Sequence, residues 1–130
     1  MFAVDTNIVV RLLAQDEPAQ SKRSEQLFRA QEIFIPDTVI LETAWVLSEA
    51  YRFNRDQIIT GLTKLFGLSN VHLRDSIVAD LALEWYADGL DIADALHLAQ
   101  STQCQQMLTF DQRFVNRARQ LSSHPVTLLT

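Results

Sequence analysis

Short apolar runs of three to five residues alternate along the chain with longer segments that carry apolar residues at helical spacing. Runs this short suit buried strands better than helices, because a helix needs a longer periodic segment. Each run also ends at a charged residue or a turn-forming residue, as strands commonly do. Strands are therefore expected at residues 2–4, 33–35, 71–73, 106–110 and 126–129.

The segments between these strands show apolar residues three and four positions apart, the spacing of one helix face. Pro18 suits the first turn of a helix, Asp75 suits an N-cap and Gly67 suits a helix end. Strands that alternate with helices through short connections predict a parallel sheet covered by helices on both faces. Helices are expected at residues 7–14, 18–31, 37–51, 55–66, 76–87 and 91–103, with a short basic helix after residue 111.

Length and composition indicate an ordinary globular protein. The chain has 130 residues, 48% of them hydrophobic and 21% charged. A single domain over residues 1–130 is expected at this length. The composition excludes a disordered or fibrous chain. Its apolar runs fall far short of the ~20 residues that cross a bilayer, so no membrane protein is expected.

Charge and cysteine content bear on the cellular compartment and on the binding of nucleic acid. Asp5 interrupts any apolar signal segment, and the single Cys104 allows no intrachain disulfide. Both observations favour a cytoplasmic protein. The formal net charge of -5 has the wrong sign for binding nucleic acid by bulk electrostatics. Divalent cations held by convergent carboxylates would reverse the local field and let phosphate approach.

Two aspartates occupy equivalent places, because Asp5 and Asp111 each follow an apolar strand directly. Parallel strands end at the same edge of a sheet, where open α/β folds bind their ligands. Neighbouring strands lie about 4.8 Å apart, so carboxylates on adjacent strands can share one ion. The alternative interpretation is that each aspartate only caps the helix that follows it.

Glu42 lies within the helix expected at residues 37–51. Its neighbours on the same helix face are Thr38, Val39, Trp45 and Val46, which are mostly apolar. A carboxylate on a packed face is costly to bury unless a cation or a hydrogen-bond donor compensates it. The alternative is a glutamate at the edge of that face, with its carboxylate in solvent.

Asp91 and Asp94 stand three residues apart where the helix at residues 91–103 begins. This spacing is typical of a helix N-terminus, with an N-cap and an acid in the first turn. Capping is the favoured role for Asp91. Asp94 shares its helix face with Asp91 and His97, which allows its carboxylate to face the same crevice as the other acids.

Four short motifs together resemble those of the PIN-domain ribonucleases, in particular the VapC toxins of type II toxin-antitoxin pairs. They are Asp-Thr-Asn after the first strand, a glutamate in the helix after the second strand, Asp-Ala-Leu-His-Leu-Ala at a late helix start, and Thr-Phe-Asp after the next strand. The motifs follow the family's order, and the resemblance runs from Phe2 to about Leu128.

The resemblance implies a PIN-like three-layer α/β/α sandwich around a central, mostly parallel sheet. It also implies a divalent-metal-dependent endoribonuclease that cleaves RNA phosphodiesters with a water activated by Mg²⁺ or Mn²⁺. Hard cations of this kind prefer oxygen ligands, which agrees with an acidic set. The residues that match the family's catalytic and metal-binding acids are Asp5, Glu42, Asp94 and Asp111. Polar positions beside the metal pocket are matched by Asn7 and Thr109, and Asp91 matches a position that is acidic in some relatives only.

The resemblance further implies partners. Proteins of this type are cytoplasmic toxins that act on RNA, form homodimers and are neutralised by a small antitoxin whose peptide arm covers the acidic crevice. A second interpretation is a catalytically inactive PIN-like module that binds RNA or a protein. The sequence leaves open whether one or two ions act.

Overall fold

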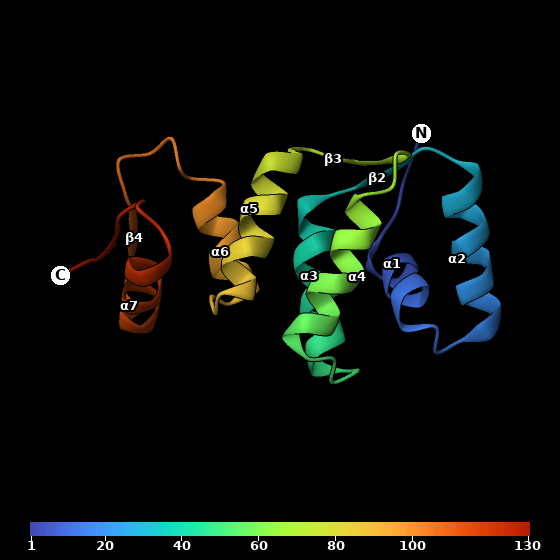
Figure 1. The fold of residues 1–130 in the computed structure, drawn as a ribbon, viewed down its shortest axis with the longest axis horizontal. Helices are drawn as coiled ribbons and strands as arrows, with labels where there is room; N and C mark the ends of the chain where they lie inside the picture. Colours follow the sequence, from blue (N-terminus) through green and yellow to red (C-terminus); the bar gives the residue numbers. More distant parts are fainter. The chain divides into compact units, whose positions relative to one another are not determined.

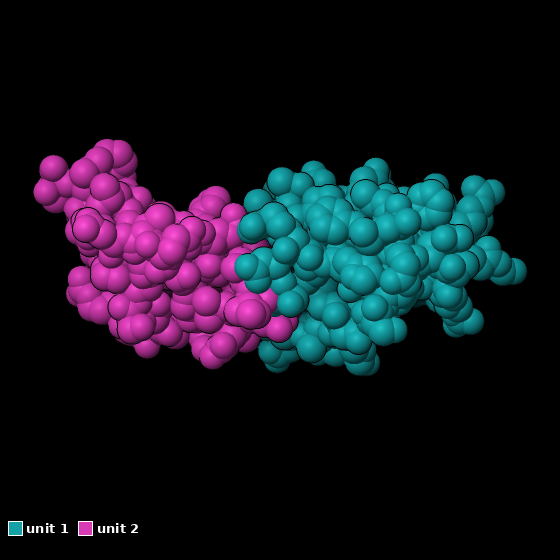
Figure 2. Space-filling model, turned by 90° about the horizontal axis from the view of Figure 1, so that it is seen from above, with its two compact units in different colours: residues 1–76 teal, residues 77–130 magenta.

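Strands and helices alternate along the whole chain, and the computed structural model describes every residue from Met1 to Thr130 (Figure 1). The backbone contacts divide it into two compact units. The N-terminal unit is Met1–Ser76 and the C-terminal unit is Ile77–Thr130, shown in teal and magenta in Figure 2.

The N-terminal unit contains a three-stranded sheet in the order β1-β2-β3. Both strand pairs are parallel, with Phe2 opposite Ile33 and Ile33 opposite Val71. Parallel pairing requires a crossover between successive strands, and the helices supply it. The elements are β1 (Phe2–Ala3), α1 (Thr6–Ala14), α2 (Pro18–Ala30), β2 (Ile33–Ile35), α3 (Asp37–Glu49), α4 (Arg55–Phe66) and β3 (Val71–Leu73).

Helix packing in this unit follows the apolar spacing of the sequence. α1 contacts α2 and α3, while α4 contacts α3 and β3. On α4, the buried residues Ile58, Leu62 and Leu65 recur at steps of four and three and form one face. Buried Ser21 on α2 donates its hydroxyl to the carbonyl of Arg11, at 2.8 Å. This bond ties the start of α2 to the end of α1.

Local signals set the helix starts in this unit. Pro18 occupies the first turn of α2, as predicted. α4 begins with a capping box, in which Asn54 accepts from the Gln57 backbone N–H and the Gln57 side chain accepts from the Asn54 N–H, both at 2.8 Å. The reciprocal bonds satisfy two backbone donors that the helix itself leaves unpaired.

The C-terminal unit contains a parallel pair of strands, β4 and β5, with Met107 opposite Val126. α7 contacts both strands. Residues Ile92, Ala95, Leu96, Leu98 and Ala99 are buried on α6. The elements are α5 (Ser76–Ala87), α6 (Ile92–Ala99), β4 (Met107–Thr109), α7 (Gln112–Leu121) and β5 (Val126–Leu128).

α6 ends at Ala99, four residues before the predicted end at residue 103. The Ser101 hydroxyl donates to the carbonyl of His97 at 2.7 Å, and the Ser101 N–H donates to the carbonyl of Leu98 at 3.0 Å. These bonds satisfy carbonyls that a longer helix would otherwise use, so the last turn tightens and the chain leaves the helix.

The predicted α/β fold class with parallel strands is confirmed. Strands at residues 33–35 and 71–73 and helices at 55–66 and 76–87 begin and end where the sequence predicts. The single domain stays a prediction. No helix here is both long enough and apolar enough to cross a membrane.

Thr43 offers a test of the packing around α3. Its side chain is 0% exposed and its hydroxyl has no hydrogen-bond partner. A buried hydroxyl without a partner costs free energy, so Thr43→Val is expected to stabilise the fold by about 1 kcal/mol. Thermal unfolding would show this as a rise in Tm of about 4 °C. The control Thr43→Ser keeps the hydroxyl and loses a methyl group, and a rise in Tm for it as well would contradict the explanation.

Candidate active site

Asp5 lies between β1 and α1 and has the capping role that the sequence left open. It is the N-cap of α1, and its Oδ1 accepts from the backbone N–H of Ile8 at 3.3 Å. The side chain is exposed, and Oδ2 takes no part in the cap. Asp5 therefore caps the helix and still presents an oxygen at the carboxyl end of β1.

Glu42 lies on α3 and accepts a short hydrogen bond at Oε1 from the Thr6 hydroxyl. Its own side chain is exposed, as is Thr38, and Trp45 is 60% exposed. The prediction that Glu42 projects from a packed face is therefore wrong, and the alternative of a position at the edge of that face is correct. The prediction assumed that the apolar residue Trp45 is buried, but Trp45 does not pack into the core.

Thr6 is a site residue that sequence reasoning missed. It is 7% exposed, at the first position of α1, and holds the Glu42 carboxylate next to the strand end that carries Asp5. It belongs to the Asp-Thr-Asn motif, but a hydroxyl in the first turn of a helix is common and gives no separate signal. Asn7 is exposed and lines the same surface groove as Asp5.

Asp111 repeats the arrangement of Asp5 in the C-terminal unit. It is the N-cap of α7, and its Oδ1 accepts from the N–H groups of Arg113 at 2.9 Å and Phe114 at 3.4 Å. Thr109 Oγ1 accepts from the Asp111 N–H at 3.0 Å. The position of this carboxylate is therefore fixed by hydrogen bonds to its own Oδ1 and to the backbone N–H of Asp111.

Asp91 has the N-cap position of α6, yet its side chain makes no capping hydrogen bond. The prediction that capping is its main role is wrong. Asp91 has the extended backbone expected of an N-cap, with φ -62° and ψ 148°. Its exposed carboxylate remains available for other interactions.

Asp91, Asp94 and Asp111 line one small pocket of about 40 Å³. Burial raises the pKa of Asp94, and the negative charges of Asp91 and Asp111 raise it further, while His97 opposes the shift. A half-buried carboxylate beside two others is the situation in which a cation is favoured.

Two arginines, Arg113 and Arg117, line this pocket as well. Neither forms an ion pair with the carboxylates. Arg117 instead donates a short hydrogen bond from Nη1 to the carbonyl of Gly89. The two arginines therefore share the pocket with the three aspartates without a direct ion pair to any of them.

The structure thus brings together Thr6 and Glu42 in one unit, and three aspartates in the other. No group of three or more His, Cys, Asp and Glu side chains is arranged so that it could hold a metal ion. The donor atoms are nevertheless all carboxylate oxygens, which suit Mg²⁺ and Mn²⁺. The pKa of Asp94 is raised first by burial and then by the charges of Asp91 and Asp111, and a cation would offset both effects. A shared metal site of Asp5, Glu42, Asp94 and Asp111 stays a prediction.

The pKa of Asp94 predicts how stability depends on pH. Its folded-state pKa lies above the ordinary value of 3.8, so the ionised form is less favourable in the folded protein than in the unfolded chain. Stability is therefore lost as pH rises from the unfolded pKa through the folded one. Asp94→Asn removes the charge, so in EDTA its Tm is expected to exceed that of the parent near pH 7, with the gain vanishing below about pH 3.8.

The matched control for this measurement is Asp80→Asn, which removes an exposed carboxylate on α5 outside the pocket. It is expected to show no such gain. A gain for Asp94→Asn that stays constant from pH 3 to pH 8, or a lower Tm at neutral pH, would contradict this account of the pocket.

Comparison with known proteins places this geometry in a family. The profile of the PIN domain matches residues 2–120, which include all four predicted metal-binding acids. No curated protein matches the chain. PIN domains are generally nucleases, and those nucleases generally use divalent metal ions. Because the match spans nearly the whole sequence, the chain belongs to the PIN domain family.

Proposed function

We propose that this PIN domain is a divalent-metal-dependent endoribonuclease. In this proposal Asp5, Glu42, Asp94 and Asp111 are the catalytic, metal-binding carboxylates. The observation that carries it is the half-buried carboxylate of Asp94, which shares one small pocket with two other aspartates. In a family that generally consists of nucleases, such a pocket is best explained as part of a cation site.

The residues of the chain would position the carboxylates before any ion binds. Backbone N–H groups hold one oxygen each of Asp5 and Asp111, and Thr6 holds one oxygen of Glu42. Carboxylates that are already oriented lose less conformational entropy when they bind a cation. Bound Mg²⁺ or Mn²⁺ would supply electrostatic stabilisation of the phosphoryl group and lower the pKa of an attacking water.

The neighbouring polar residues would support these carboxylates. Thr109 fixes the backbone of Asp111 through its hydroxyl. Asp91, which is free of capping bonds, adds to the negative field at Asp94. Asn7 would offer an uncharged polar group beside Asp5, suited to a ribose or a phosphate oxygen.

The decisive experiment incubates the purified protein with total RNA in Mn²⁺ or in EDTA and maps the cut ends. Cleavage in Mn²⁺ and none in EDTA is expected. Asp5→Asn, Glu42→Gln, Asp94→Asn and Asp111→Asn are each expected to reduce cleavage more than about a hundredfold. Asn also caps helices well, so the substitutions at Asp5 and Asp111 preserve the helix starts. The control Asp80→Asn is expected to cleave like the parent.

Metal binding also has a readout that does not depend on activity. An ion that binds only the folded state stabilises it by about 2.7 kcal/mol at a hundredfold excess over Kd, so Mn²⁺ is expected to raise Tm. Asp5→Asn and Asp94→Asn are expected to lose most of this rise. Variants that cleave fully, or an Mn²⁺ effect that survives all four substitutions, would remove these residues from the site. Binding of RNA without cut ends in any metal would instead favour the inactive binding module.

We further propose that the nuclease is the toxin of a toxin-antitoxin pair, acting in the cytoplasm as a homodimer and neutralised by a cognate antitoxin protein. The support is the ordered set of motifs shared with VapC toxins. Induced expression in a bacterial host is then expected to arrest growth, with no arrest for Asp94→Asn at equal protein level. Co-expression of a short neighbouring reading frame is expected to restore growth, and its product to co-purify. Harmless expression of the active nuclease would contradict the toxin role.

A further inference from the structure

A second feature of the N-terminal unit is a surface groove of about 430 Å³. α1 contributes Ile8 and Arg11, and α2 contributes Arg23 and Leu27. The groove reaches Asp5 at the end of β1. Its volume falls within the range of small-ligand sites, roughly 300–1,000 Å³.

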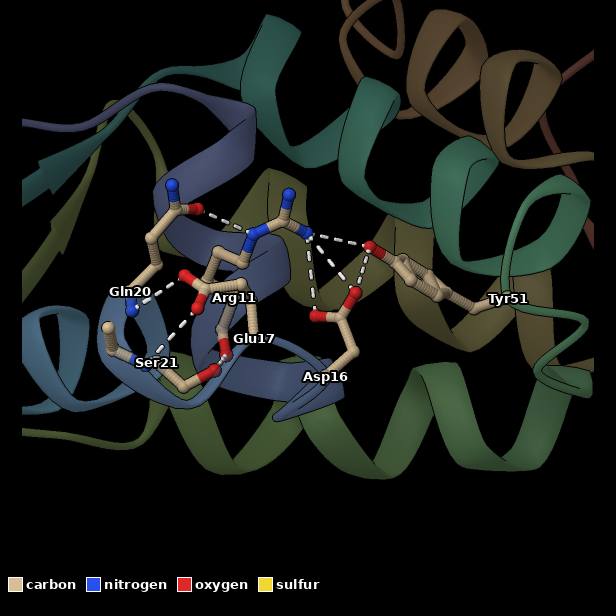
Figure 3. A network of polar contacts seen from close by, with 7 residues as sticks. Arg11, Asp16, Glu17, Gln20, Ser21 and Tyr51 are labelled. Atoms are coloured by element: carbon tan, nitrogen blue, oxygen red, sulfur yellow. Dashed lines mark hydrogen bonds and ion pairs between the residues drawn. The ribbon is translucent and has the colours of Figure 1, made fainter.

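Arg11 is held in this groove by a network of polar contacts (Figure 3). Its Nε donates to Gln20 Oε1 at 2.7 Å, and its Nη1 donates to the Tyr51 hydroxyl at 2.8 Å. The same Nη1 lies 3.4 Å from the Asp16 carboxylate, to which Tyr51 also donates, at 2.8 Å. The hydrogen bond to Tyr51 raises the pKa of Arg11, whose guanidinium is charged at neutral pH in any case.

These contacts leave one nitrogen of Arg11 unused. Nε and Nη1 make all of the hydrogen bonds in the network, whereas Nη2 makes none of them and carries no dashed line in Figure 3. A fixed guanidinium with a free N–H edge is suited to an anion, because the fork geometry matches phosphate and the side chain is already ordered.

Arg23 adds a second cation to the same groove. It is exposed on α2 and forms no ion pair. Two guanidinium groups and the carboxylate of Asp5 therefore line the groove, and Asp16 beside Arg11 balances part of the positive charge. Ile8 and Leu27 supply apolar surface on which a ribose or a base can rest.

We propose that this groove binds the RNA backbone beside the cleaved bond, with Arg11 and Arg23 contacting a phosphate of the neighbouring nucleotide. The inference rests on the proposed function, because Asp5 both lines the groove and is a proposed metal ligand. A phosphodiester bound at Asp5 has its next phosphate within one nucleotide, and the other charged residues that line the groove are the two arginines. The contacts would position RNA without reading its sequence.

Binding of a fluorescent single-stranded RNA to the full chain in EDTA tests this inference, with anisotropy measured over a series of salt concentrations. Arg23→Gln is expected to weaken binding about fivefold and to lower the slope of log K against log salt by about 0.7, the value for one lost contact to single-stranded RNA. Arg29→Gln is the matched control. It removes an exposed arginine from the same helix, outside the groove, and is expected to bind RNA like the parent.

Arg11→Lys tests the geometry of the fixed guanidinium, since lysine keeps the positive charge but lacks the planar pair of N–H donors. It is expected to weaken RNA binding with a smaller change in the salt slope than Arg23→Gln, while Tm shows that the protein is folded. In cleavage assays with Mn²⁺, Arg23→Gln is expected to raise KM and to leave kcat near that of the parent.

The two hypotheses fail in different ways. Parental affinity and salt slope for both Arg23→Gln and Arg11→Lys would overturn the groove proposal, even if Mn²⁺-dependent cleavage persists, and the groove would then be free for a protein partner. An absence of cleavage in Mn²⁺, with RNA binding that still depends on Arg23, would overturn the nuclease and its cleavage site but would support RNA binding by the groove.

Discussion

The half-buried carboxylate of Asp94 is the feature of the C-terminal unit on which its candidate chemistry depends. Asp94 is half-buried next to Asp91 and Asp111, and its pKa rises because burial and two like charges oppose its ionisation. Nearby arginines form no ion pair with these groups. Carboxylate oxygens of this kind are the donors that hard divalent ions prefer, which is why the proposed function assigns a cation to them.

Two of the four candidate ligands are also helix N-caps. Asp5 begins α1 and Asp111 begins α7, and in each case one carboxylate oxygen accepts from backbone N–H groups. A carboxylate has two oxygens, so capping and metal binding do not compete for the same atom. The N-terminal ends of helices also favour negative charge, which lowers the cost of gathering acids there. Asp5 and Asp111 therefore stabilise the helix starts and are also candidate metal ligands.

The net charge of the chain does not show that acidic and basic side chains lie in different places on the protein. Acids gather at strand ends, whereas the groove between α1 and α2 presents two arginines. The Tyr51–Asp16 pair holds Arg11 and partly balances its charge, and Gln20 fixes its orientation. An acidic protein can thus offer a cationic path to a polyanion, because approach depends on the field near the site more than on the total charge.

Apolar periodicity and local capping residues were sufficient to predict from the sequence the parallel α/β class, the bounds of elements such as α4 and β3, and the strand-end position of Asp5 and Asp111. These features depend on interactions within a few residues, which the sequence carries directly. Tertiary structure decided the exposure of Glu42 and Trp45 and the bond from Thr6. Those outcomes depend on which distant side chain covers or bonds each group, and the spacing of residues along one helix contains no information about that partner.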